Sequence, residues 1–137
     1  MSRTAAILCV DDETLVLETL EIEFHKAFND TYRYEFAESA EEALEIIQER
    51  HEEGIKILVI ISDWLMPGMK GDELLIQVDD KWPHIAKVML TGQADQTAIE
   101  RAQEEAHLLR CLYKPWNSQE LLETIKTGLA TSRKLKD

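Results

Sequence analysis

The chain has 137 residues, of which 45% are hydrophobic and 31% are charged, as is typical of one soluble globular domain. Its formal net charge of −12 argues against nucleic-acid binding, because proteins that bind phosphate backbones concentrate lysine and arginine. No apolar run approaches the roughly 20 residues needed to span a bilayer, and the acidic N-terminal region is unlike a signal peptide. We therefore expect a cytoplasmic protein with no direct nucleic-acid or membrane partner.

In the first part of the chain, segments with the apolar pattern of a strand alternate with segments that have the pattern of a helix. Residues 5–12 are short and largely apolar, which predicts a buried strand, and residues 13–28 repeat apolar side chains every three or four positions, which predicts an amphipathic helix. Residues 32–38 alternate aromatic and polar side chains, which favours a strand near a sheet edge. Ser39, with a glutamate three residues later, begins a capping box for a helix over 39–54.

The middle of the chain continues this alternation. Residues 55–63 form the most apolar segment and predict a central strand. A short helix over 71–83, closed by a proline, precedes another strand at 86–92. A helix with an apolar stripe is predicted over 95–107.

The last elements complete a fold of five strand–helix pairs. A strand is predicted over 108–115, and a second capping box begins a helix that runs from Asn117 to about Arg133. Short apolar strands alternating with helices predict an α/β fold with a five-stranded parallel sheet and helices on both faces, and right-handed crossovers leave few possible strand orders. We expect one domain over 1–137, with a core of about 4–130 and a basic tail or linker start at 131–137.

Polar residues follow every predicted strand. They are Asp11 and Asp12, Glu38 and Ser39, Asp63, Thr91, and Lys114. In an open parallel sheet, ligands bind beyond the carboxyl ends of the strands, where the strand order reverses. If the strand order is 2-1-3-4-5, the first and third strands are neighbours, and Asp11, Asp12 and Asp63 would converge on one pocket, flanked by Thr91 and Lys114.

Turn and cap preferences alone would explain one aspartate at a strand end, but they explain the whole set less well. Three close carboxylates repel one another unless a cation is present, and Mg²⁺ prefers such oxygen ligands. A lysine and a hydroxyl opposite the metal would complement the oxygens of a phosphoryl group. An aspartate at the centre can act as the nucleophile and become an acyl phosphate.

Four motifs, each placed directly after a predicted strand, give the chain a resemblance to a known family. They are "VDDE" (10–13), "SDWLMPGMKGDEL" (62–74), "MLTG" (89–92) and "YKPW" (113–116). In this order they resemble the receiver domain of two-component response regulators, which implies the flavodoxin-like, CheY-like fold with the strand order 2-1-3-4-5. The resemblance covers nearly all of residues 4–130.

The resemblance implies a role for each matching residue. Asp63 matches the phosphoacceptor, Asp12 a direct Mg²⁺ ligand, and Asp11 a carboxylate that acts through metal-bound water. Leu65 matches the position whose backbone carbonyl completes the metal site.

The match continues at three further positions, two of which correspond to residues that interact with the phosphoryl group. Thr91 matches the hydroxyl residue that moves toward it, and Lys114 matches the lysine that pairs with it. Pro115 follows a peptide bond that is commonly cis in this family.

The implied function is a phosphorylation-dependent signalling switch. A sensor histidine kinase or a phosphotransfer protein would supply the phosphoryl group, and the domain would catalyse only its own phosphorylation and dephosphorylation. The surface of the fourth helix, fifth strand and fifth helix would then act on an output domain or partner protein, or form a homodimer.

The chain departs from the family pattern at positions that bear on switching. Cys111 stands three residues before Lys114, where receivers often carry a phenylalanine or tyrosine, and Tyr113 shares its face if the strand is regular. Leu65 and Gln93 occupy positions that tune dephosphorylation in the family. Because Leu65 cannot hydrogen-bond an attacking water, we expect a long-lived acyl phosphate.

Two other functions are compatible with parts of this pattern. An aspartyl-phosphate phosphatase would need an acid/base carboxylate two residues after its nucleophile, and Leu65 stands there instead. A scaffold of the same fold that signals without phosphorylation would not need the complete set of polar residues. We therefore favour the phosphorylated switch.

Overall fold

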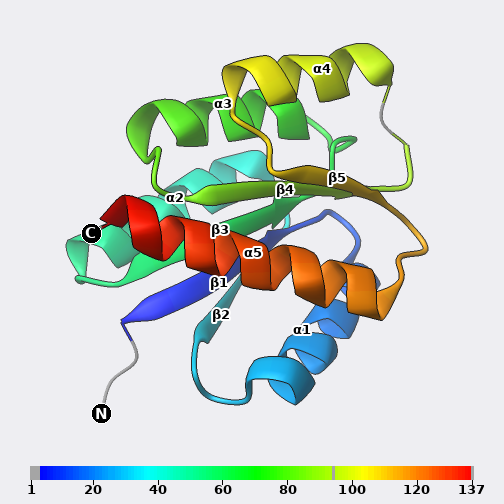
Figure 1. Cartoon of the computed structure of the whole chain (residues 1–137). Coiled ribbons are helices and arrows are strands. Elements are labelled where there is room, and N and C mark those ends of the chain that lie inside the picture. The colour runs from blue at the N-terminus through cyan, green and yellow to red at the C-terminus, as the bar shows by residue number, and fades with distance from the viewer. Residues whose placement is uncertain (1–3, 94, 137) are drawn as a thin grey trace.

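A computed structural model describes residues 4–93 and 95–136 of the chain, with side chains described as far as 132 (Figure 1). The elements alternate strictly between strand and helix. They are β1 (Ala5–Val10), α1 (Thr14–Phe28), β2 (Arg33–Ala37), α2 (Ala40–Glu52), β3 (Lys56–Ser62), α3 (Gly71–Lys81), β4 (Ala86–Thr91), α4 (Gln96–Glu105), β5 (Arg110–Tyr113) and α5 (Ser118–Lys136). Within the described residues, no helix combines the length and apolarity that a membrane crossing requires.

The five strands form one parallel sheet in the order β2-β1-β3-β4-β5, which confirms the predicted fold class. The most apolar strand, β3, lies at the centre, and β2 lies at an edge, both as predicted. Helices cover both faces of the sheet (Figure 1). Because β1 and β3 are neighbours, the chain segments that leave their carboxyl ends start side by side.

Each face of the sheet packs against its own set of helices. On one face, α2, α3 and α4 contribute buried side chains such as Ile47, Leu74 and Ala102. On the other face, α1 and α5 contribute side chains such as Phe24 and Ile125. Alternate residues of each strand point to the two faces, so the apolar runs of the strands fill both cores.

The helix starts follow the capping signals in the sequence. The Ser39 hydroxyl accepts the Glu42 N–H at 3.1 Å, and the Asn117 side chain accepts the Glu120 N–H at 2.9 Å. The returning bond of the first capping box differs from the usual pattern, because the Glu42 carboxylate accepts the N–H of Glu38, at 2.6 Å. These bonds satisfy N–H groups that the first helical turn leaves unpaired.

The predicted strand over 108–115 is shorter than expected and covers only Arg110–Tyr113. The Leu108 N–H bonds to the Ala102 carbonyl at 3.2 Å, which keeps this residue with the end of α4 instead of the sheet. At the other end, the Lys114–Pro115 peptide bond is cis, and Pro115 has no N–H to donate to the ladder. The predicted boundaries were therefore too wide at both ends.

A buried ion pair that the sequence analysis missed joins α3 to β4. The Lys87 side chain is only 2% exposed, and its Nζ lies 2.7 Å from the Asp79 carboxylate and 2.7 Å from the Ile85 carbonyl. The second Asp79 oxygen lies 2.9 Å from His107 Nδ1. Burial opposes ionisation of Asp79, but Lys87 and His107 outweigh it and lower the pKa of this carboxyl below its usual value.

We expect Lys87→Met to lower the free energy of unfolding at pH 7 by about 1–3 kcal/mol, because it leaves the Asp79 carboxylate without its buried cation. A carboxyl with a lowered pKa contributes stability above the pKa of the unfolded chain and loses it as the pH falls through the folded-state value. The difference from wild type should therefore be complete above about pH 5 and shrink as the pH falls below about 4. Urea denaturation across this range measures it.

Lys56→Met is a matched control, because Lys56 is an exposed lysine on another strand. Its effect should stay within about 0.5 kcal/mol and should not depend on pH in this way. Equal effects of the two substitutions would contradict a stabilising role for the buried pair.

Candidate functional site

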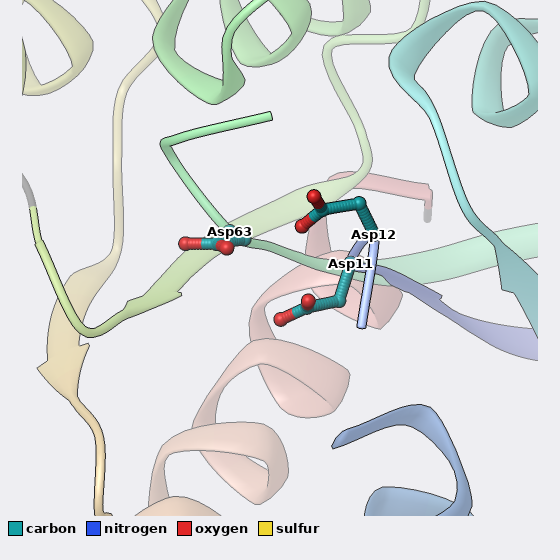
Figure 2. Close-up of side chains that lie close together, drawn as sticks. All are labelled: Asp11, Asp12 and Asp63. Carbon is teal, nitrogen blue, oxygen red and sulfur yellow. The ribbon is translucent and has the colours of Figure 1, made fainter. Parts of the chain in front are cut away.

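Three aspartates gather at the carboxyl ends of the two central strands. Asp11 and Asp12 follow β1, and Asp63 follows β3 (Figure 2). One carboxylate oxygen from each lies within 4.8 Å of the others. Asp11 is 1% exposed and Asp63 is 6% exposed, whereas Asp12 is open to solvent. The convergence expected from the strand order is therefore present in the structure.

Backbone hydrogen bonds fix the two buried aspartates. The Asp63 N–H donates to the Val10 carbonyl at 3.0 Å, so the end of β3 stays paired with the end of β1. The Asp63 Oδ1 accepts the Trp64 N–H at 2.8 Å, and the Asp11 Oδ1 accepts the Glu13 N–H at 2.8 Å. Each carboxylate thus keeps its second oxygen for other partners.

Lys114 brings a positive charge to these second oxygens. Its Nζ lies 2.6 Å from Asp11 Oδ2 and 3.4 Å from Asp63 Oδ2, with Glu13 at 3.6 Å. Burial opposes the charge of Lys114, but the bond to Asp11 and the nearby carboxylates outweigh it and raise its pKa. Lys114 is therefore a cation fixed beside the aspartates.

The charges at this site do not balance. The pKa of Asp11 is raised, mainly because the group is buried, even though Lys114 and the Glu13 N–H favour its ionised form. Asp11, Asp12 and Asp63 together carry up to three negative charges against the single charge of Lys114. Oxygen ligands this close, with a remaining excess of negative charge, fit a hard divalent cation.

The aspartates adjoin a surface pocket of about 610 Å³. Its lining includes five of the six predicted site residues, namely Asp12, Asp63, Leu65, Thr91 and Lys114. The sixth, Asp11, is buried beside Lys114. The structure therefore brings the predicted set together around one space, and it adds Glu13, which directly follows Asp12 and also lines the pocket.

Thr91 and Leu65 face the pocket in different ways. The Thr91 hydroxyl is fully buried, accepts the Gln93 N–H at 3.1 Å and donates to the Gln93 carbonyl at 3.2 Å, so it is bound to its own loop. Leu65 is 43% exposed and lines the pocket. With Met66 and Pro67, it forms the apolar part of a pocket that is also lined by charged side chains such as Asp63 and Lys114.

The loop that follows Asp63 returns at Gly71, where the start of α3 lies close to the backbone of Asp63 and Trp64. The Gly71 N–H donates to the Trp64 carbonyl at 2.8 Å. A Cβ atom at position 71 would lie 2.1 Å from the Asp63 carbonyl oxygen and 2.8 Å from the Trp64 Cα. Glycine at this position therefore allows the start of α3 to pack directly against the backbone of the site.

Cys111 and Tyr113 lie on the same face of β5, as regular strand alternation predicts. Cys111 is half-buried against the core beneath α2, α3 and α4, and its thiol contacts the Tyr113 side chain. Tyr113 itself is exposed. The aromatic residue on this face is therefore Tyr113, which pairs with Thr91 at the end of β4, whereas Cys111 pairs with Met89.

Comparisons with known proteins agree on one family. The model of the response regulator receiver domain matches residues 7–126. The hydrogenase transcriptional regulatory protein HoxA of Cupriavidus necator is 29% identical over 93% of this chain, which spans about a quarter (24%) of that relative. The chemotaxis protein CheY of Pseudomonas aeruginosa is 33% identical over 49% of this chain and 55% of its own length.

Solved structures give the same result. The signal receiver domain of an HD domain-containing protein from Pseudomonas fluorescens has a TM-score of 0.87 and 29% identity, covering 99% of this chain and 94% of that one. A CheY-like response regulator receiver domain protein from Methanospirillum hungatei has a TM-score of 0.83 and 29% identity, covering 97% and 98%.

We expect Gly71→Ala to lower the free energy of unfolding by about 1–3 kcal/mol, because the added methyl group must push the Asp63 carbonyl away. Gly92→Ala is the control, since Gly92 lines the same pocket but a Cβ atom there meets nothing within 4 Å. Urea denaturation of both variants measures the difference. Equal stability of the two would show that the close approach at Gly71 is not a constraint.

Proposed function

The chain belongs to the response regulator receiver domain family, which serves phosphorylation-based two-component signalling, and we propose that its phosphoacceptor is Asp63. The observation that carries this proposal is the grouping of Asp11, Asp12 and Asp63 beside Lys114 at the carboxyl ends of two adjacent strands. A site of this kind matches both the charge and the oxygen geometry of a phosphoryl group held near a cation.

The environments of the three aspartates favour Asp63 as the nucleophile. Asp11 does not line the pocket, and its Oδ2 is already paired with the Lys114 Nζ at 2.6 Å. Asp12 is exposed and therefore strongly hydrated. Asp63 is nearly buried yet lines the pocket, and its Oδ2 is farther from Lys114, at 3.4 Å. It is the carboxylate that is both oriented and open to a phosphodonor.

The reaction transfers a phosphoryl group from a phosphohistidine on a sensor histidine kinase or a phosphotransfer protein. A carboxylate oxygen of Asp63 forms the new P–O bond as the P–N bond breaks, and the imidazole nitrogen keeps the electron pair and takes up a proton. The product on this chain is an acyl phosphate. Lys114, whose pKa is raised, remains charged and pairs with the phosphoryl oxygens.

Mg²⁺ is the cation that suits the acidic cluster. Asp11, Asp12 and Asp63 would hold it, directly or through water, together with the backbone carbonyl of Leu65. When bound, Mg²⁺ offsets the negative charge of the carboxylates and of the phosphoryl oxygens. The excess of negative charge around Lys114 supports this role.

The readout is a change at the surface formed by α4, β5 and α5. In the unmodified chain the Thr91 hydroxyl bonds to the Gln93 backbone, and a phosphoryl group on Asp63 would compete for it. Movement of Thr91 would reposition the loop between β4 and α4 and shift an existing equilibrium between two conformations. An output domain, a partner protein or a second copy of the chain would bind the altered surface.

The test is intact-mass analysis after incubation with phosphoramidate. Wild type with Mg²⁺ should gain one phosphoryl mass, and removal of Mg²⁺ with a chelator or the substitution Asp63→Asn should abolish the gain. Asp80→Asn, which changes an exposed aspartate on α3, should leave it intact. No adduct on a wild-type chain that still binds Mg²⁺ would favour a scaffold that signals without phosphorylation.

The exposed side chain of Leu65 yields a prediction about the lifetime of the acyl phosphate. Leu65→Asn should accelerate loss of the phosphoryl mass by roughly twofold to tenfold, because the amide can hydrogen-bond the attacking water and Leu65 cannot. Leu15→Asn, at an exposed leucine on α1, is the control and should not change the decay. A wild-type lifetime as short as that of a free acyl phosphate would contradict the role of Leu65.

A further inference from the structure

A third buried carboxylate, outside the acidic cluster, lies on the first turn of α3. Asp72 is 8% exposed and does not line the pocket beside Asp63. Its Oδ1 accepts the Trp64 indole N–H at 3.1 Å, and its Oδ2 accepts a guanidinium N–H of Arg101 at 3.3 Å. Trp64 belongs to the loop after β3 and Arg101 to α4, so Asp72 connects three segments of the chain.

Trp64 also contacts the phosphoacceptor through its backbone. Its N–H donates to Asp63 Oδ1 at 2.8 Å, and its carbonyl accepts the Gly71 N–H at 2.8 Å. The Lys70 ammonium lies 5.2 Å from the centre of the indole ring. These hydrogen bonds and the covalent bonds of the Trp64 side chain therefore form a continuous path from the Asp63 carboxylate, through Trp64 and Asp72, to Arg101 on α4.

We propose that Asp72 is a positioning residue that couples the state of Asp63 to the position of α4. The coupling rests on the proposed phosphorylation of Asp63. A phosphoryl group changes the charge and the hydrogen bonding of the carboxylate that the Trp64 N–H now contacts. Both Asp72 oxygens are occupied, and a buried carboxylate is costly to leave unpaired, so a shift of Trp64 is passed to Arg101.

The simpler role for Asp72 is to stabilise the start of α3, where a negative charge interacts favourably with the helix dipole. Glu73 shares this first turn and this charge, but its side chain is exposed and forms no hydrogen bond or ion pair with any residue that the structure describes. A role limited to the helix dipole would make the two residues equivalent. Only Asp72 contacts both Trp64 and Arg101.

The contacts also predict the size of the effect. Arg101 is 47% exposed and shares its guanidinium with Glu105 at 3.4 Å, so its pairing with Asp72 is screened by solvent. Coupling of this kind is modest. We expect substitutions along the path to reduce the change that α4 undergoes when Asp63 is modified by about twofold to fivefold, while the chain stays folded.

The first readout is the indole N–H resonance of Trp64 in the NMR spectrum of the unmodified chain, identified by its loss in Trp64→Phe. It should shift in Asp72→Asn, which keeps an acceptor for the indole but loses the one for Arg101, and in Arg101→Gln. It should not shift in Glu73→Gln. The indole resonances of Trp82 and Trp116 are internal references, which should not move in any of these variants.

The second readout is the shift of the α4 backbone amides when Mg²⁺ and beryllium fluoride, a mimic of the phosphoryl group, are added. Relative to wild type and Glu73→Gln, the shift should be at least halved in Asp72→Asn and Arg101→Gln. Intact-mass analysis should still detect phosphorylation of both variants by phosphoramidate. An undiminished α4 response in both variants would overturn the coupling. A wild-type chain that takes up no phosphoryl group would instead overturn the proposed function, and the coupling with it.

Discussion

The crowding of carboxylates at the ends of β1 and β3 is the constraint on which the rest of the site depends. Asp11, Asp12 and Asp63 bring ligand atoms within 4.8 Å of one another, and Lys114 offsets only part of their charge. Burial adds to the cost, as the raised pKa of Asp11 shows. This arrangement is unfavourable in isolation, and under the proposed function a cation and a phosphoryl group would complement it.

The fold holds this arrangement in place with backbone contacts. The hydrogen bond from the Asp63 N–H to the Val10 carbonyl fixes the ends of the two central strands relative to each other. Gly71 lets the first turn of α3 approach the Asp63 backbone more closely than any side chain would allow. Both faces of the sheet are packed against helices, so the ends of the strands are held in place. The charged side chains at these ends therefore stay close together despite their repulsion.

The sequence predicts the parts of this protein that depend on local periodicity and on topology. Alternating strand and helix patterns give all ten elements, and the handedness of the connections leaves few strand orders, among which the resemblance to receiver domains selects the observed one. That order then brings together the residues at the strand ends. The contacts of Asp72 with Trp64 and Arg101, and the buried pair of Lys87 and Asp79, were not predicted. They depend on side-chain packing between α3 and its neighbours, which periodicity does not specify.

Chemical trapping of the acyl phosphate tests the central claim, that Asp63 receives the phosphoryl group, most directly. Borohydride reduces an acyl phosphate to an alcohol, so a phosphorylated aspartate becomes homoserine at its own position in a peptide map. After incubation with phosphoramidate and Mg²⁺, we expect homoserine at position 63, with Asp11 and Asp12 unchanged. Homoserine at position 11 or 12, or a phosphorylated chain that borohydride leaves unchanged, would contradict it.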